Sequence, residues 1–215
     1  MIILALDTTS NEGSLAIRRD GRIVAQQVLH SADGFAHLIF PAIRDICRQA
    51  EVRFGEVDCF AAASGPGSFT GVRVGVSAVK GMAEALGKSA LGISNLRALS
   101  TFGSSPLRAV AIDAHRGGDV YAAVYSSEGH LVGEECVNEF SDWLASVPAS
   151  VDEFIFPEPD AHLASALTGR RVVYAPTNLS GAVALCAESD LRAGLPGDPA
   201  AVDANYVREF LARKQ

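Results

Sequence analysis

The sequence lacks the segments that carry a protein into or across a membrane. No apolar run approaches the roughly 20 residues that a membrane-spanning helix needs. The N-terminal segment has no basic region, and its apolar run reaches Asp7 too early for a secretory signal peptide. We therefore expect a cytoplasmic protein that does not associate with membranes.

Cysteine is scarce, and its spacing excludes the common cysteine frameworks. The four cysteines are scattered, with no CxxC pair and no zinc-binding spacing: Cys47, Cys59, Cys136 and Cys186. Three of them lie in apolar surroundings, so we expect buried free thiols in a reducing compartment.

Positive charge is also in short supply. The chain has 18 Lys and Arg against 25 Asp and Glu, which gives a net charge of −7. A stand-alone nucleic-acid binder relies on Lys and Arg for affinity, so the balance argues against one. It remains compatible with a subunit whose partner supplies the positive surface. The 215 residues are 48% hydrophobic, which is enough to form one core or two small ones.

Three common catalytic motifs are missing. His37 is followed four residues later by Pro41, so there is no HxxxH pair to offer two imidazoles to a metal. Ser64 and Ser68 lack the G-x-S-x-G frame of a nucleophile elbow. The first basic residue after the glycines is Arg73, not a Walker A lysine. We expect no catalytic residue and no metal site, and we interpret His37 as a surface or interface residue.

Apolar patterns predict an α/β chain. In the first half they indicate strands at 2–6, 14–18, 23–29, 58–64 and 91–93. Residues 20–21 form a hairpin turn signal between the second and third of these strands. Helical spacing predicts helices at 35–50, 72–86 and, more briefly, 96–102. Pro41 lies inside the first helix and should kink or weaken it.

The second half repeats this order. Residues 109–113 mirror 3–7, and each segment ends at an aspartate, Asp113 and Asp7. The further expected elements are strands at 120–125 and 129–132, helical segments near Trp143 and at 162–167, a strand at 172–174, and helices at 179–193 and 206–213.

A duplicated βββαβα unit is the architecture of the actin-like ATPase (ribonuclease H-like) fold, so we predict two lobes of that fold. We expect residues 1–103 to form the N-terminal lobe, with a C-terminal helix at 205–215 packing on it. Residues 104–204 would form the second, smaller lobe, after a boundary near the Gly-Ser-Ser-Pro stretch at 103–106.

A glycine-rich loop at 65–71 follows one predicted strand and precedes a helix. Such a loop presents backbone N–H groups and a positive helix end, most often to a phosphate. The candidate residues of a vestigial ATP or ADP site are Asp7, Thr8, Thr9, Gly65, Gly67 and Asp113. In the alternative interpretation the Asp-Thr-Thr segment only closes a tight turn by bonding its own backbone. Likewise, Asp113 would only pair with Arg116 and pin a hairpin.

The helix after this loop carries two stripes. One is polar, with Arg73, Ser77, Lys80 and Glu84; the other is small or apolar, with Gly71, Gly75, Ala78, Met82 and Ala85. Small residues let a neighbouring helix approach closely. That neighbour is either the helix at 35–50 or a partner subunit that covers both helices. Under the second interpretation, the interface residues are His37, Leu38, Gly71, Arg73, Gly75, Ser77, Ala78 and Met82.

Several motifs together resemble the bacterial TsaB (YeaZ) family over nearly the whole chain. They are GPGSFTGVRVG at 65–75, ILALDTT at 3–9, IDAHRGGDVY at 112–121 and Tyr206-Val207-Arg208. The resemblance implies a subunit of the machinery that makes N6-threonylcarbamoyladenosine at the tRNA adenosine next to the anticodon. It also implies a partner without catalytic activity or cofactor that dimerises with the catalytic subunit TsaD and activates it. The ATPase TsaE would join this pair, and tRNA would bind through the complex.

Two departures from the family pattern leave the roles of some residues open. His115 interrupts the family's Asp-Ala-Arg motif, and Ala204-Asn205 replaces the start of a Pro-x-Tyr-x-Arg motif. The alternative function is a nucleotide-binding ATPase or kinase-like protein of the actin-like superfamily, and a third is a metalloprotease. In isolation, the apolar helix face predicts a homodimer.

Overall fold

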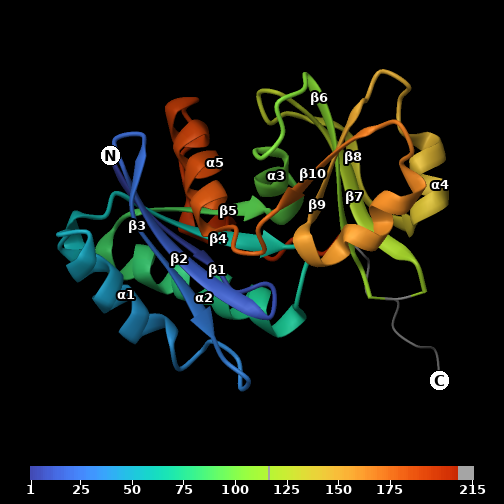
Figure 1. Cartoon of the computed structure of the whole chain (residues 1–215). Coiled ribbons are helices and arrows are strands. Elements are labelled where there is room, and N and C mark those ends of the chain that lie inside the picture. Colours follow the sequence, from blue (N-terminus) through green and yellow to red (C-terminus); the bar gives the residue numbers. More distant parts are fainter. Residues whose placement is uncertain (116, 208–215) are drawn as a thin grey trace. The chain divides into compact units, whose positions relative to one another are not determined.

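The structure is a computed structural model that describes residues 1–115 and 117–207, and it contains two compact units. The first unit consists of residues 1–98 and 176–204. Residues 99–175 and 205–207 belong to the second. Figure 1 labels the elements of both units.

A five-stranded sheet forms the centre of the first unit. Its strands lie in the order β3 (Arg22–His30), β2 (Glu12–Arg19), β1 (Ile2–Asp7), β4 (Cys59–Gly65) and β5 (Ser89–Ser94). The hairpin strands are antiparallel, whereas β4 and β5 run parallel to β1. The carboxyl ends of β1, β4 and β5 therefore meet at one edge of the sheet.

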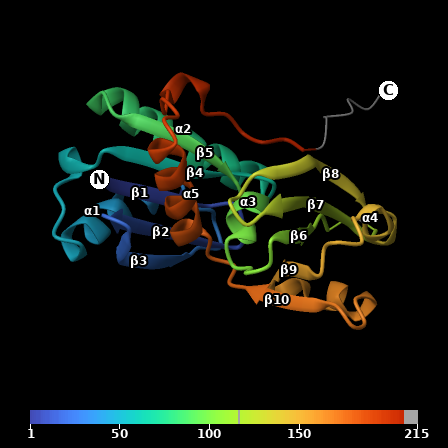
Figure 2. The same cartoon turned by 90° about the horizontal axis from the view of Figure 1, so that it is seen from above.

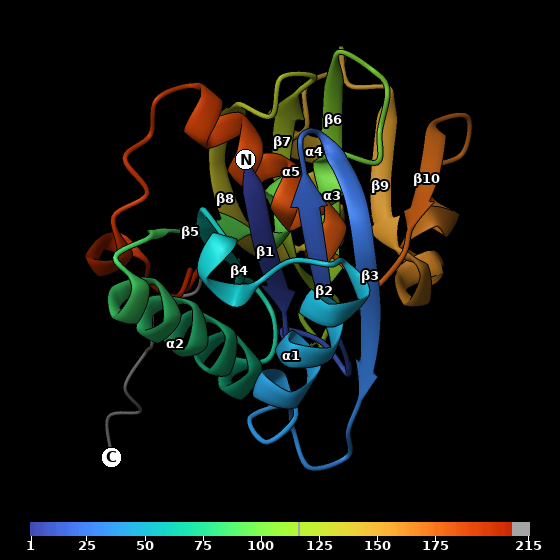
Figure 3. The same ribbon diagram turned by 90° about the vertical axis from the view of Figure 1, so that its left-hand side faces the viewer.

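Helices cover both faces of this sheet. The helices α1 (Ile39–Gln49) and α2 (Phe69–Leu86) lie side by side on one face, and α5 (Ser180–Arg192) lies on the other (Figure 3). Successive strand residues point to opposite faces. Leu4 and Leu6 accordingly belong to the core beneath α1 and α2. Short helical segments follow at η1 (Phe54–Glu56), α3 (Asn95–Ser100) and η3 (Pro199–Ala201).

Helix α1 begins later than predicted, at Ile39 instead of Phe35. The N–H groups of Leu38 and Ile39 both donate to the Phe35 carbonyl, which forms a turn before the helix. Pro41 is then the third helical residue, where the N–H has no intrahelical acceptor in any helix. The expected kink is therefore not needed, and the missing donor costs nothing.

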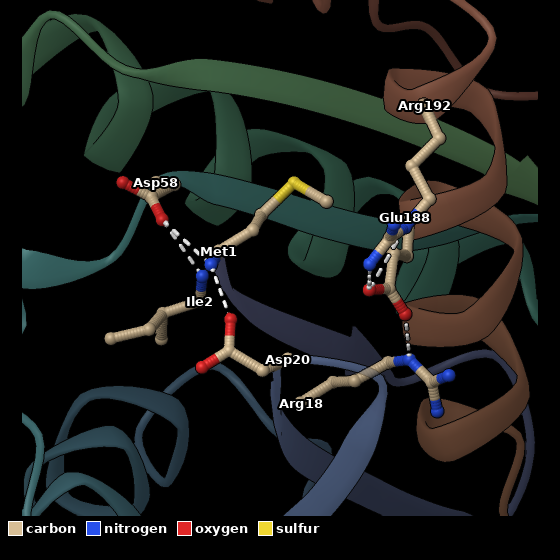
Figure 4. A network of polar contacts seen from close by, with 7 residues as sticks. All are labelled: Met1, Ile2, Arg18, Asp20, Asp58, Glu188 and Arg192. Carbon is tan, nitrogen blue, oxygen red and sulfur yellow. Dashed lines mark hydrogen bonds and ion pairs between the residues drawn. The ribbon is translucent and has the colours of Figure 1, made fainter.

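The position of α5 changes the predicted domain limits. Residues 176–204 belong to the first unit, not to a lobe at 104–204, because α5 buries residues such as Val183 and Ala187 against the first sheet. Glu188 of α5 accepts hydrogen bonds from Arg18 of β2 and Arg192 (Figure 4). The predicted helix at 205–215 starts with residues 205–207, which are not helical, and its remainder lies outside the described residues.

The second unit repeats the architecture of the first. Its strands lie in the order β10 (Arg171–Ala175), β9 (Glu153–Pro157), β6 (Leu107–Asp113), β7 (Asp119–Ser126) and β8 (Leu131–Glu139) (Figure 2). Strand directions match those of the first sheet, element for element. Helix α4 (Phe140–Ser146) and the segment η2 (Glu158–Ala166) complete it. The chain thus has the predicted actin-like fold.

Two structural findings bear on the absences noted in the sequence. None of the helices in the described part of the chain combines the length and apolar character needed to cross a bilayer. All four cysteines are free, and Cys47, Cys59 and Cys186 are buried. This confirms the prediction of three buried free thiols.

Candidate functional site

The first candidate site is the sheet edge where β1, β4 and β5 end. Ligands of open α/β sheets bind at this kind of edge, outside the carboxyl ends of the strands. Five of the six residues predicted for a vestigial nucleotide site lie here: Asp7 ends β1 and is followed by Thr8 and Thr9, and Gly65 ends β4, two residues before Gly67. Both threonines and the aspartate are buried, at 4% exposure or less.

Hydrogen bonds from within the fold occupy the carboxylate of Asp7. One oxygen, Oδ1, accepts from Thr9 N–H at 3.0 Å and from Thr9 Oγ1 at 2.6 Å. The other, Oδ2, accepts from Leu179 N–H at 3.1 Å, at the start of α5. Burial raises the pKa of Asp7 above its ordinary value, and these hydrogen bonds oppose the rise. The carboxylate thus caps a helix of its own unit, where an anion is favoured by the helix dipole.

Asn95, which directly follows β5, connects this network to β4. Its Nδ2 donates to Thr9 Oγ1 at 2.6 Å, and its Oδ1 accepts from Gly65 N–H at 3.2 Å. The side chain is 3% exposed. Sequence reasoning missed Asn95, although an asparagine two residues after the strand predicted at 91–93 is a signal for such a bond.

The glycines of the loop lie against the backbone of Thr8 and Thr9. A Cβ at Gly67 would lie 2.5 Å from the Thr9 carbonyl oxygen, and one at Gly71 would lie 1.8 Å from that of Thr8. Ser68 N–H donates to the Thr9 carbonyl at 2.7 Å, and Thr8 Oγ1 donates to the Gly71 carbonyl at 2.6 Å. Glycine is needed here so that α2 can approach the turn after β1. The hydroxyls of Thr8 and Thr9 and the N–H groups of Gly65, Ser68 and Gly71 thus all donate to groups within the fold.

The sixth predicted residue, Asp113, lies at the end of β6 in the second unit, as Asp7 does at the end of β1. Its carboxylate accepts from His115 N–H at 2.6 Å and lies 3.4 Å from Nε2 of His162. Its own N–H donates at 2.9 Å to Asp160, a residue that the sequence did not single out. Burial raises the pKa of Asp160, and the hydrogen bond from Asp113 opposes the rise. Arg116, the predicted partner of Asp113, lies outside the described residues.

The described residues contain no cluster of three or more His, Cys, Asp or Glu side chains arranged to hold a metal ion. His37 lies in the exposed turn before α1, not on the helix itself.

The second candidate site is a groove of about 540 Å³ between α1 and α2. Figure 3 shows these two helices facing the viewer. The groove is lined by Ala36, Ile39, Phe40, Phe69, Thr70, Arg73, Val74, Ser77 and Ala78. Phe40 is 60% exposed and Phe69 is 40% exposed. Large aromatic side chains stabilise a fold or an interface most when their apolar surface is buried. The guanidinium of Arg73 lies 3.6 Å from the centroid of the Phe69 ring.

The groove includes part of the predicted interface. Arg73, Ser77 and Ala78 line it, while Leu38 is half-buried beside the core. Sequence reasoning missed the two aromatic residues, Phe40 and Phe69. Phe69 lies within the glycine-rich motif, where the glycines are the stronger sequence signal.

Three predicted interface residues are instead buried inside their own unit: Gly71, Gly75 and Met82. A Cβ at Gly75 would lie 2.7 Å from Thr8 Oγ1, and Met82 belongs to the core beneath α1 and α2. Their predicted place on an exposed helix face is wrong, because these three members of the stripe face the core and the turn after β1.

Comparison with known proteins identifies related families. The model of the family described as "TsaD: tRNA N6-adenosine threonylcarbamoyltransferase" matches residues 24–189. The tRNA threonylcarbamoyladenosine biosynthesis protein TsaB of Bacillus subtilis is 28% identical over 149 residues, which are 67% of this chain and 65% of that protein. Its namesake in Escherichia coli is 33% identical over 142 residues, 63% of this chain and 60% of that protein. Each match therefore spans less than two thirds of the relative.

Likeness to a solved structure extends further along the chain. YeaZ from Pseudomonas aeruginosa has a TM-score of 0.79 and 25% sequence identity, covering 95% of this chain and 99% of that one. The matched family model spans well over half of the chain, and the two relatives and the solved structure above are named TsaB or YeaZ. The chain therefore belongs to the family of TsaD-related proteins and, within it, to the TsaB (YeaZ) family.

Proposed function

We propose that the chain is a non-catalytic subunit in the synthesis of N6-threonylcarbamoyladenosine in tRNA. It would dimerise with a TsaD-like catalytic subunit and activate it. The TsaB relatives are named for this biosynthesis, and the matching family model is named for the transferase. The single observation that carries the partner role is the groove between α1 and α2, with Phe40 and Phe69 exposed at its walls. An apolar surface of this kind marks a protein–protein contact.

The turn after β1 supports a non-catalytic role, because hydrogen bonds within the fold occupy its polar side chains. Asp7 and Thr9 form hydrogen bonds with each other, with Asn95 and with α5, so they would not hold a nucleotide. The proposal therefore includes no cofactor. Titration calorimetry with magnesium and ATP should show no binding to the isolated chain. Tight binding would instead favour the alternative, a nucleotide-binding ATPase or kinase-like protein.

The other partners follow from the same proposal. A TsaE-like ATPase would join the heterodimer, and tRNA would bind through the complex, because this chain's net charge of −7 does not favour an independent contact with RNA. The complex would act in the cytoplasm. Without its partner, the chain would cover the groove with a second copy of itself.

Substitution of Ala78 tests the contact directly. Ala78 lines the groove, so Ala78→Arg places a long charged side chain where a partner must pack. We expect binding to the TsaD-like subunit to weaken by about 30-fold or more, the loss typical of a central interface position. Gel filtration of the mixed subunits measures binding, and mass spectrometry of tRNA nucleosides measures modification.

Ala85→Arg is the matched control, because Ala85 is an exposed alanine of the same helix that does not line the groove. It should bind and support modification like the natural chain. Circular dichroism checks that both variants fold. Normal binding and normal modification by folded Ala78→Arg would refute the partner role of the groove.

A further inference from the structure

The two edges of the first sheet differ in what covers them. At the β5 edge, Ala90 N–H donates to the Gly197 carbonyl at 2.7 Å, and Lys80 holds the same segment through bonds to the carbonyls of Ala200 and Val202. At the other edge, β3 is the terminal strand, and within the described residues its only ladder is with β2 (Figure 3). The outward N–H and C=O groups of β3 are therefore available to another strand.

Strand β3 lacks most of the features that stop edge strands from pairing with other chains. Such features are charge, proline, very short length and bulges. The strand is nine residues long, and its sequence RIVAQQVLH contains no proline, no lysine and no acidic residue. Val24 and Val28 are 39% and 37% exposed. One bulge lies near the hairpin turn, opposite Ile17 and Arg18, and residues 25–30 pair regularly with β2.

The edges of the second sheet are less suited to adding a strand. At one edge, β10 is only five residues long. At the other edge, β8 carries Glu134, Glu135 and Glu139, which would repel a copy of the same strand. Asn205 Nδ2 also donates to Glu135 at 2.6 Å. Among the four sheet edges of the described residues, β3 is the one that best fits another strand.

The residue order of β3 suits antiparallel pairing with a second copy of itself. If a two-fold axis passes through Gln26, Val24 of each copy lies directly opposite Val28 of the other. These two positions differ by an even number of residues, so the outward backbone groups of the two strands also face each other. An axis through Ala25 would place Val24 opposite Gln26, and an axis through Gln27 would place Val28 opposite Gln26. The register about Gln26 pairs the two exposed valines, and such cross-strand pairs stabilise a sheet.

We propose that β3 is a docking site for a second copy of this chain. The two β3 strands pair antiparallel about Gln26 and join the first-unit sheets of the two copies. This contact goes beyond the proposed function, because no residue of β3 is among those that line the groove between α1 and α2. A sheet-edge contact is small, and two chains of net charge −7 repel each other, so we expect a dissociation constant of about 1–100 μM.

A charge pair placed across the two copies tests both the site and its register. The background is Ala78→Arg, which blocks contacts through the groove. In this background, Val24→Lys and Val28→Glu should each weaken the dimer about tenfold, since each sets a charge against a valine of the other copy. The double variant should recover to within about threefold, because each lysine then lies opposite a glutamate of the other copy.

Val132→Lys is the matched control, because Val132 is a 42% exposed valine of another edge strand, β8. It should leave the dimer unchanged. Val24 and Val28 are exposed, so their variants should fold, as circular dichroism can check. Analytical ultracentrifugation measures the homodimer, and calorimetry measures binding of the TsaD-like subunit, which Val24→Lys in the natural chain should not alter.

Three results would overturn the inference: a folded Ala78→Arg chain that stays monomeric well above the expected dissociation constant, a dimer that neither single variant weakens, or a double variant that does not recover. Weaker binding of the TsaD-like subunit by folded Val24→Lys would also overturn it, because the edge would then not be separate from the groove. Failure of the proposed function gives a different result. Normal binding of that subunit by Ala78→Arg would remove the role of the groove and leave the β3 dimer standing.

Discussion

Gly71 offers a direct test of why the loop after β4 is rich in glycine. In Gly71→Ala, the new Cβ would lie 1.8 Å from the Thr8 carbonyl oxygen and 3.0 Å from its carbon. Both are backbone atoms, so no side-chain rotation relieves the clash. Either the start of α2 or the turn after β1 must move by more than about 1 Å, since real Cβ contacts lie beyond 3.0 Å.

The expected loss of stability follows from three contributions. Overpacking of this kind costs about 1–3 kcal/mol. The movement also breaks the bonds from Thr8 Oγ1 to the Gly71 carbonyl and from Ser68 N–H to the Thr9 carbonyl, at about 1 kcal/mol each. Alanine favours the helix over glycine by up to about 1 kcal/mol, which acts in the opposite direction. We therefore expect the free energy of unfolding to fall by about 2–4 kcal/mol.

Urea unfolding followed by far-UV circular dichroism measures this change. The single tryptophan, Trp143, lies in α4 of the second unit, so its fluorescence follows that unit separately. Gly81→Ala is the matched control, because it lies in the same helix and a Cβ there meets nothing within 4 Å. It should be neutral or stabilising by up to about 1 kcal/mol. Stability of Gly71→Ala within about 0.5 kcal/mol of the natural chain would show that the close approach is not what the glycine provides.

One further substitution and one chemical modification test the buried ionisable groups. Burial raises the pKa of Asp7, so its contribution to stability is complete below the ordinary value of 3.8 and is lost as the pH rises through the higher folded value. Relative to Asp7→Asn, the natural chain should therefore lose stability as the pH rises from that region, and parallel urea midpoints for the two proteins would contradict this. Burial also raises the pKa of Cys59 to about 12 and that of Cys186 to about 11. Iodoacetamide at mildly alkaline pH should thus modify the half-exposed Cys136 before either of them, as mass spectrometry of the native protein can check.

The sequence allowed most of the first unit to be predicted. Its hairpin strands and α2 show clear patterns, and each duplicated first strand ends at an aspartate, Asp7 or Asp113. Strand β9 was missed, and its residues Glu153 to Phe156 are all buried. A strand buried on both faces shows no alternation to detect.

The candidate site was predicted less completely, for a geometric reason. The polar stripe correctly placed Arg73 and Ser77 on the outside of α2, because charge and exposure go together. Gly71 and Gly75 were assigned to the wrong face of α2. A stripe of glycines has the same spacing in the sequence whether the space beside it is filled by another helix or by a turn of the same unit. Only the distances to Thr8 separate these cases. Asn95 could not be linked to Thr9, since 86 residues separate them in the sequence.

The return of α5 to the first sheet has a consequence for synthesis of the chain on the ribosome. Strands β1 to β5 emerge first, but one face of their sheet stays uncovered until Ser180–Arg192 has been made. Residues 99–175 of the second unit are continuous and emerge before that helix. Nascent chains usually complete their N-terminal domain first. Here the unit that is begun first is completed last, and its apolar strand residues are exposed to other nascent chains and to chaperones in the interval.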